Sequence, residues 1–490
     1  MYLQRLYRPT NLLVALLFVV FPALIGLVSF GVGFNGLYGQ DGFGYIQFTE
    51  AWSQFFTTGV RGDQGFITWP PLYAIVGAMA HVFLGLNVQL FFQVSSLVLF
   101  GAAGYFLYLT VKRMQLLSER SALLLVGLFF MCSPYMIRQS TLVMSDLLCV
   151  LLIILTYYQL LRWKRGGQFN LLLVFVFAAL AVLTRYGAFF LVAAPCGYAV
   201  YASLRQKQYL ILALGVGLGL LCLVPLLGAN VQGGGTFVSH PFLNSWNPLN
   251  FFRSSFTLDS STQQFSWPNI VFVASLFGHP GYLVAGLLLL PFYKHIWLQR
   301  NWLTGVGGLS ILIYLFFLAG TPFQNPRYLL LAFPVLVLLL PPALHGIQSF
   351  VSEAKWRKVV AVAAIATIVP VAGALSIYSI RTIWTWHQQE KQIGAFLQGP
   401  PRTIYSYGLD VSLRYYAPNH TYYSYHETQN RKADYKRGDN VFIDKFSLEG
   451  ERKNQLVAEA WEHLENNYEL LPIGEFGDKW TLYMVKGPLN

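Results

Sequence analysis

The sequence predicts a polytopic α-helical membrane protein with a small C-terminal α/β domain. Of its 490 residues, 55% are apolar, 16% are aromatic and only 11% are charged, whereas a typical soluble domain has about 25% charged residues. Apolar runs of about 20 residues, long enough to cross a hydrocarbon layer of about 30 Å, recur along most of the chain. Most acidic residues lie after residue 380, which indicates a change to a water-exposed segment.

About eleven apolar segments are predicted to span the membrane, within a transmembrane domain over residues 1–380. A further segment, 70–86, begins with two prolines and holds His81, so it is interpreted as a juxtamembrane or re-entrant helix that belongs to an outer loop over residues 35–86. The predicted spans are 11–34, 87–111, 121–137, 141–161, 170–183, 187–203, 209–228, 269–292, 302–320, 328–344 and 359–380.

The basic residues predict the orientation of these spans. With a cytoplasmic N-terminus, most lysines and arginines before residue 380 fall in cytoplasmic loops, as the positive-inside rule requires. The net charge of +12 is therefore explained by topology, and no nucleic-acid partner is expected. The four cysteines lie in apolar runs without CxxC spacing and are interpreted as buried apolar groups.

Residues 381–490 are predicted to form an extracytoplasmic α/β domain, because helical and alternating strand patterns follow one another there. Helices are expected over 391–398 and 452–467, and strands over 402–408, 440–446 and 479–487.

Two carboxylates stand at the outer ends of spans. Asp41, in "YGQDGFGYIQF", is the first acidic residue of the chain; it is either a solvated turn residue or a reactive group. Asp146 opens the span "STLVMSDLLCVLLIIL", where a carboxylate is favoured by the helix dipole or marks function, since acids at membrane depth are costly.

The outer arginines also have two interpretations each. Arg185 lies between two short spans and is expected to face a polar cavity, whereas Arg327 and Arg138 either snorkel to the interface or bind substrate. Arg61 and Asp63 either pair in a solvated loop or join the site. The remaining cavity candidates are Tyr45, His81, Tyr186 and Tyr328, of which His81 has the alternative of an ordinary helix histidine.

Carboxylates and arginines on one membrane face suit an anionic, lipid-linked substrate. Arginine binds phosphate oxygens through its planar guanidinium, and a carboxylate acts as a general base toward a hydroxyl or helps to hold a divalent cation. No GxxxxGK[ST] and no strand-linked GxGxxG occurs in the sequence, so no nucleotide cofactor is expected.

The order of these motifs resembles the GT-C superfamily of polyprenyl-phosphate-dependent glycosyltransferases, and the layout is most similar to glycosyltransferase family 39 and the bacterial aminoarabinose transferases. The matching stretches are "GQDGFGYIQF", "TWPPLYAIVGAMAHVFLGL", "STLVMSDLLCVLL", "AVLTRYGAFFLVAAP" and "NPRYLLLAFPVLVLL", followed by a C-terminal outer domain.

The resemblance implies roles for these residues. Asp41 would be the catalytic carboxylate, Asp146 a second acid or metal ligand together with Asp63, and Arg185 and Arg327 the donor-phosphate contacts, joined by Arg61 and Arg138. The chain departs from many relatives in having Gly42 after Asp41, and Arg185-Tyr186-Gly187 where Lys or Glu is common. The sequence therefore leaves open whether the protein uses a divalent cation and which acceptor it takes.

The expected activity is inverting transfer of a sugar from a polyprenyl-phosphate donor to a hydroxyl of a lipid, glycan or protein, at the outer face of the bacterial inner membrane. Two alternatives remain. One is a lipid or glycolipid flippase or transporter, which broken spans also fit. The other is an enzyme of the O-antigen ligase or polymerase type.

Overall fold

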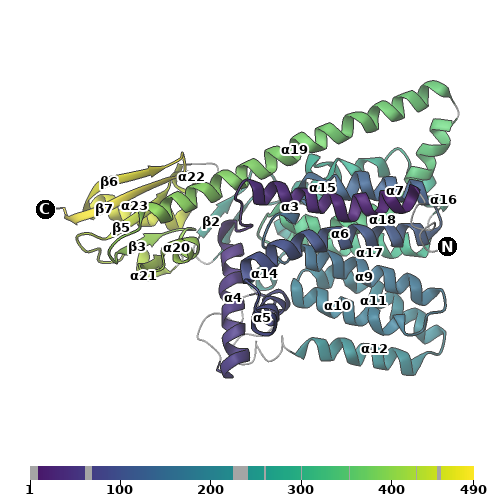
Figure 1. Ribbon diagram of the computed structural model, residues 1–490, viewed down its shortest axis with the longest axis horizontal. Coiled ribbons are helices and arrows are strands. Elements are labelled where there is room, and N and C mark those ends of the chain that lie inside the picture. Colours follow the sequence, from purple (N-terminus) through teal and green to yellow (C-terminus); the bar gives the residue numbers. More distant parts are fainter. Residues whose placement is uncertain are drawn as a thin grey trace.

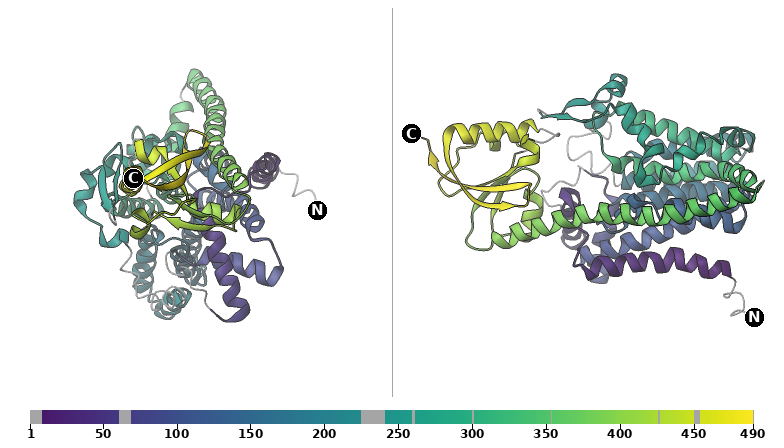
Figure 2. Two further views of the ribbon diagram at one scale, coloured as in Figure 1. Left: turned by 90° about the vertical axis from the view of Figure 1, so that its left-hand side faces the viewer. Right: turned by 90° about the horizontal axis from the view of Figure 1, so that it is seen from above.

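The computed structural model describes residues 9–60, 69–224, 241–258, 261–299, 301–352, 354–425, 427–449 and 454–489. The chain is a multi-span helical membrane protein with a small sheet at one end of its helical bundle, as Figures 1 and 2 show. The predicted fold class is confirmed. The helices of the bundle run roughly parallel to the long axis of the molecule. The sheet lies along the same axis, past one end of the bundle.

The N-terminal half consists of helices. They are α2 (Pro9–Ala15), the π-helical turn η1 (Leu16–Val20), α3 (Phe21–Gly31), α4 (Gly39–Thr58), α5 (Leu72–Leu84), α6 (Val88–Met114), α7 (Glu119–Val126), η2 (Gly127–Met131), α8 (Pro134–Ser140), α9 (Asp146–Lys164), α10 (Asn170–Thr184), α11 (Ala188–Arg205) and α12 (Tyr209–Cys222).

The rest of the bundle includes one short hairpin. Its elements are α14 (Pro241–Asn244), η4 (Pro248–Phe252), the antiparallel strands β1 (Ser255–Leu258) and β2 (Ser261–Gln264), α15 (Asn269–Gly278), η5 (Pro280–Tyr282), η6 (Ala285–Leu289), α16 (Tyr293–Gln299), α17 (Trp302–Gly320), α18 (Pro326–Ser352) and α19 (Lys355–Phe396).

Within the described ranges, seven helices are long and apolar enough to cross a membrane, or eight if the pair Glu119–Met131 and Pro134–Ser140, bent by 69°, is one span. Two further predicted spans, 170–183 and 209–228, correspond to the shorter apolar helices α10 and α12. The predicted continuous span over 269–292 is wrong. Helix α15 ends at Gly278, because Pro280 forces His279 into an extended conformation, and 3₁₀ turns follow.

Helix α4 lies across the end of the bundle that carries the sheet, roughly perpendicular to the spans (Figure 1). The helix begins at Gly39, so Asp41 lies in its first turn. A carboxylate is favoured there by the helix dipole. The helix ends at Thr58, and the next residue, Gly59, adopts a φ of 71° that favours glycine.

Helix α19 connects the bundle to the C-terminal sheet without a break over 42 residues. The predicted domain boundary between residues 380 and 381 falls inside this helix. The elements that follow are β3 (Thr403–Ser406), α20 (Asp410–Tyr416), β4 (Thr421–Ser424), α21 (Thr428–Arg431), β5 (Asn440–Asp444), α22 (Lys445–Glu449), α23 (Gln455–Asn467), β6 (Tyr468–Phe476) and β7 (Trp480–Pro488).

The five strands form one mixed sheet in the order β4-β3-β5-β7-β6, in which β4, β3 and β5 are parallel. Successive side chains of a strand point to opposite faces. Ile404 and Phe442 therefore pack with α19 and α20, whereas Tyr405 and Val441 pack with α23. The predicted strands correspond to β3, β5 and β7. Strands β4 and β6 and helix α20 were not predicted. Strand β4, with four residues, is too short for an alternating pattern to stand out.

Candidate active site

Asp41 and Asp146 are held in neighbouring positions by a contact between the segments that precede them. The backbone N–H of Val143, just before α9, donates to the carbonyl oxygen of Gly36 at 2.8 Å. Gly36 has a φ of 80°, and a Cβ atom there would lie 2.9 Å from the Val143 side chain. Glycine is thus required for this close approach, which joins the start of α4 to the start of α9.

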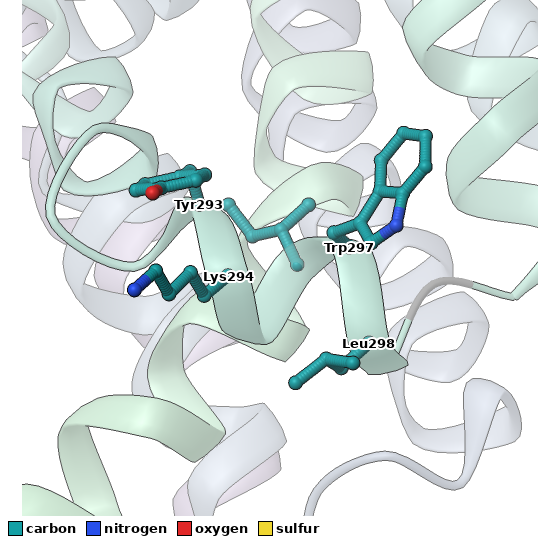
Figure 3. Close-up of a pocket in the computed structure, with 5 residues that line it drawn as sticks. Tyr293, Lys294, Trp297 and Leu298 are labelled. Atoms are coloured by element: carbon teal, nitrogen blue, oxygen red, sulfur yellow. The ribbon is translucent and has the colours of Figure 1, made fainter.

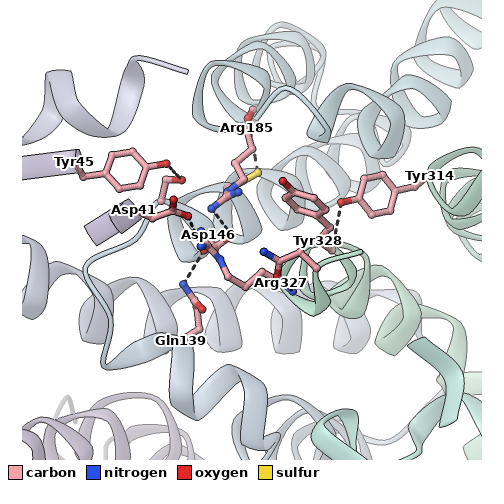
Figure 4. A network of polar contacts seen from close by, with 12 residues as sticks. Asp41, Tyr45, Gln139, Asp146, Arg185, Tyr314, Arg327 and Tyr328 are labelled. Carbon is pink, nitrogen blue, oxygen red and sulfur yellow. Dashed lines mark hydrogen bonds and ion pairs between the residues drawn. The ribbon is translucent and has the colours of Figure 1, made fainter. Parts of the chain in front are cut away.

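Arg327 connects the two carboxylates. One guanidinium nitrogen pairs with Asp41, and Nη2 lies 3.1 Å from Oδ2 of Asp146 (Figure 4). The residue stands in the first turn of α18, where Pro326 is a favoured starting residue and the side chain of Asn325 accepts a hydrogen bond from the Arg327 backbone N–H at 3.0 Å. This local cap fixes the point from which the guanidinium reaches the acids.

Arg185 completes a network of four charged groups. Its Nη2 lies 2.9 Å from Oδ1 of Asp146. The residue follows the last residue of α10 in an extended conformation, and its backbone N–H donates to Ala181. Four segments far apart in the sequence therefore bring two carboxylates and two guanidinium groups together at one end of the bundle.

The two carboxylates differ in their access to solvent. The side chain of Asp146 is 0% exposed, whereas that of Asp41 is 37% exposed. Asp146 also accepts a hydrogen bond at 2.7 Å from the Gln139 side chain, so its charge is compensated by three donors. Of the two acids, Asp41 is the one that a second molecule can reach.

Three tyrosines surround the network. The hydroxyl of Tyr45, one turn after Asp41, lies 2.6 Å from that of Ser145. The backbone carbonyl of Tyr328 accepts a hydrogen bond from the Tyr314 hydroxyl at 2.8 Å, and Figure 4 shows the Tyr328 ring beside Arg185. Of the predicted cavity residues, Tyr45 and Tyr328 therefore lie at the network.

Other predicted residues lie elsewhere. Arg138 contacts other groups than the two acids: its guanidinium lies 4.6 Å from the centre of the Tyr135 ring and donates to Ser379 at 3.4 Å. His81 is exposed and its Nδ1 lies 3.0 Å from the backbone carbonyl oxygen of Leu86, just after α5. Tyr186 stands in the turn after Arg185. Arg61 and Asp63 fall outside the described residues.

Sequence reasoning missed Gln139, Ser145 and Tyr314. Gln139 and Ser145 belong to "RQSTLVMSD", a polar stretch between two apolar runs. The signal was the concentration of hydrogen-bonding side chains next to Asp146. Tyr314 gave no such signal, because it lies within the uninterrupted apolar helix α17.

The described residues do not fit a divalent cation at Asp146. No group of three or more His, Cys, Asp or Glu side chains among them is placed to hold a metal ion. Both oxygens of Asp146 already face guanidinium groups, which would repel a cation.

A hollow of about 610 Å³ lies on α16, lined by Tyr293, Lys294, Ile296, Trp297 and Leu298 (Figure 3). It is remote from the network, because α16 packs near Gly346 in the later part of α18, whereas Arg327 is in its first turn. Exposed aromatic and lysine side chains of this kind are typical of membrane–water interfaces.

Comparison with known proteins shows that the chain is similar to glycosyltransferases. Residues 70–228 match the family described as Dolichyl-phosphate-mannose-protein mannosyltransferase. The comparison with curated proteins gives no match.

Three solved structures share the fold. ArnT from Cupriavidus metallidurans bound to undecaprenyl phosphate is 14% identical, with a TM-score of 0.60 over 96% of this chain and 97% of that one. ArnT in the apo state is 15% identical, with a TM-score of 0.57 and the same coverage. An Archaeoglobus fulgidus oligosaccharyltransferase tethered to an acceptor peptide is 12% identical, with a TM-score of 0.50 over 95% of this chain and 74% of that one. The predicted resemblance to the GT-C glycosyltransferases is thus confirmed, by the family match over residues 70–228 and by the fold over nearly the whole chain.

Proposed function

We propose that the protein transfers a sugar from a polyprenyl-phosphate donor to a hydroxyl of a lipid, glycan or protein acceptor, with inversion at the anomeric carbon. The observation that carries the proposal is the single network that joins Asp41, Asp146, Arg185 and Arg327 at the sheet-bearing end of the bundle. The bound undecaprenyl phosphate in the ArnT structure, which has the same fold, supports a lipid-phosphate donor. The orientation predicted from the loop charges makes this end extracytoplasmic.

Arg185 and Arg327 are proposed to bind the donor phosphate. The Nε atoms of both side chains are buried and have no hydrogen-bond partner among the described residues. Buried donors of this kind normally find an acceptor, and a phosphate oxygen is a strong one. When the glycosidic bond breaks, negative charge builds up on the leaving polyprenyl phosphate, and two fixed guanidinium groups would stabilise it.

Asp41 is proposed to act as the general base. Its carboxylate is the accessible one of the pair, and it would take the proton of the acceptor hydroxyl as that oxygen attacks the anomeric carbon. Attack by the acceptor and departure of the phosphate from opposite sides of that carbon would invert its configuration. The ion pair of Asp41 with Arg327 supports a base next to the proposed phosphate site.

Asp146 is proposed to be a positioning residue. A carboxylate that is fully buried between two guanidinium groups is poorly placed to exchange a proton with a substrate. It fixes the directions of Arg185 and Arg327 instead, in the way that supporting residues orient groups that contact ligands.

The test is sugar transfer by the full-length protein in nanodiscs, with a radiolabelled polyprenyl-phosphate sugar as donor and membrane glycolipids as acceptor. Asp41→Asn should lower the transfer rate by about 10²–10⁴-fold, the usual contribution of a general base. Glu50→Gln, an exposed acid on the same helix, is the matched control and should leave the rate unchanged. Full activity of Asp41→Asn would remove the proposed base, and lipid movement without any transfer would support a flippase.

A further inference from the structure

Three arginines converge at the end of the bundle that lies opposite the charged network. Helix α9 begins with Asp146 and ends at Lys164, so Arg162 lies about 24 Å from the network along the helix, at 1.5 Å per residue. Arg113 stands in the last turn of α6, which packs along α9 (Figure 1). Arg165 directly follows α9, and its Nη2 donates to the backbone carbonyl oxygen of Arg113.

Two of these guanidinium groups share one aromatic ring. The guanidinium carbon of Arg113 lies 4.6 Å from the centre of the Tyr158 ring, and that of Arg162 lies 5.9 Å from it. Tyr158 is buried and packs edge-to-face with Phe106, with 5.4 Å between ring centroids. Each cation is attracted to the ring, but the two cations repel each other. An anion bound by both arginines would remove this repulsion.

No described carboxylate pairs with any of the three arginines. Glu119, the acid that follows α6 in the chain, pairs with Lys112 at 2.7 Å and accepts a hydrogen bond from Tyr108 at 2.8 Å. Nη1 of Arg113 is buried and has no hydrogen-bond partner among the described residues. Buried donors of this kind normally have an acceptor, and a planar guanidinium fits phosphate oxygens. The three arginines thus have the chemistry of a phosphate site.

The surface on the membrane side of the arginines is apolar. Phe106 lies two turns before Arg113 on α6, and Leu155 lies two turns before Arg162 on α9, so each stands on the same face of its helix as the arginine that follows it. Both side chains are partly exposed. A phosphate held by the arginines would therefore have apolar contacts on its membrane side, which the acyl chains of a lipid require.

We propose that the ends of α6 and α9 bind the phosphate headgroup of an anionic phospholipid. The orientation predicted from the loop charges makes this end cytoplasmic, and basic clusters between membrane helices on that side bind anionic headgroups. A zwitterionic lipid would bring its own ammonium group close to the arginines and so lose part of the attraction. A soluble phosphate would make no contact with Phe106 and Leu155, so it would bind more weakly than the lipid.

The experiment is native mass spectrometry of the full-length protein in detergent, titrated with phosphatidylglycerol or with phosphatidylcholine of the same acyl chains. The dissociation constant of the first bound lipid is measured. Each arginine near an anionic headgroup contributes a factor of about five, so phosphatidylglycerol should bind the wild type at least about fivefold more tightly than phosphatidylcholine. Arg162→Gln should weaken its binding about fivefold, and Arg113→Gln/Arg162→Gln about 25-fold. Glycerol phosphate in large excess should not displace it.

The matched control is Arg205→Gln/Lys207→Gln. It removes the same number of charges on the same side of the membrane, at the end of α11, where Arg205 donates to the Tyr201 hydroxyl at 3.1 Å. It should keep the wild-type dissociation constant. Thermal unfolding in detergent checks the folding of each variant. Arg162 is exposed, so Arg162→Gln alone carries the test if the double variant is destabilised.

The inference would be overturned by equal binding of the two lipids, by displacement of phosphatidylglycerol by glycerol phosphate, by wild-type binding in Arg162→Gln and the double variant, or by an equal loss in the control. Sugar transfer plays no part in this measurement. Failure here would therefore leave the proposed function standing, and absence of sugar transfer would leave the phospholipid site standing.

Discussion

Two ion pairs, one in the C-terminal sheet and one in the bundle, have similar distances and very different surroundings. In the C-terminal sheet, Lys486 lies 2.6 Å from Glu469, and the two side chains are 43% and 58% exposed. In the bundle, Arg185 lies 2.9 Å from Asp146, with exposures of 15% and 0%. Exposed pairs contribute about 0–1 kcal/mol to stability. Removal of one partner from a buried pair costs about 3–5 kcal/mol, because the other charge stays buried without compensation.

The difference indicates why the bundle holds these charges. Well-packed apolar side chains would often stabilise a buried site as much as an ion pair does. A buried network at membrane depth is therefore poorly explained by stability alone, and function is the better explanation. The surface pairs of the sheet need no such explanation.

The largest effect should follow from Asp146→Asn. The substitution keeps the shape of the side chain but leaves Arg185 without its counter-ion, so we expect a loss of about 3–5 kcal/mol in the free energy of unfolding. Glu469→Gln removes a carboxylate from the exposed pair and serves as the control. The midpoint of thermal unfolding in detergent, followed by intrinsic fluorescence, gives the comparison. Equal shifts for the two variants would mean that burial does not distinguish the regions.

A smaller effect is expected from Gln139→Leu. Its amide donates to Asp146 at 2.7 Å in a buried setting, and hydrogen bonds to charged groups contribute about 1.5–3 kcal/mol. Gln429, whose amide donates to the Glu427 carboxylate at 2.9 Å on the surface of the sheet region, provides Gln429→Leu as the matched change. The same unfolding assay should give a clearly larger shift for position 139, and a reversed order would contradict the comparison.

The smallest effect should follow from Lys486→Ala. The pair with Glu469 is exposed, so stability should change by less than about 1 kcal/mol. Because salt screens exposed charges over about 10 Å at 0.1 M, the remaining difference should shrink further as salt is raised. A loss as large as that of Asp146→Asn, or one that persists in 1 M salt, would show that this pair is not of the ordinary surface kind.

The sequence predicted which charged residues lie together better than it predicted where the helices begin and end. Asp41, Asp146, Arg185 and Arg327 stand out because ionisable residues are rare in apolar segments, and the structure brings them together. Whether each has its proposed role stays a prediction. Arg138 stands out by the same criterion, yet its guanidinium stacks on Tyr135. The sequence indicates the depth of a side chain in the membrane, but it does not indicate the direction in which the side chain leaves its helix.

Elements with long, regular patterns were predictable, and short or interrupted ones were not. The span 302–320 matches α17 residue for residue. The span over 269–292 is wrong because hydropathy averages over Pro280, which ends the helix. Strand β4 is held by its pairing with β3, a contact between distant segments that no local pattern encodes.

The length of the unbroken helix α19 sets both the distance of the sheet from the bundle and its rotation about the helix axis. Its 42 residues correspond to about 63 Å at 1.5 Å per residue, roughly twice the thickness of the hydrocarbon layer. Each residue added to or removed from its outer part would raise or lower the strands by about 1.5 Å and turn them by about 100°. The length of this one helix therefore decides whether Asp410 reaches its hydrogen-bond partner Gln40 on α4 or faces bulk water.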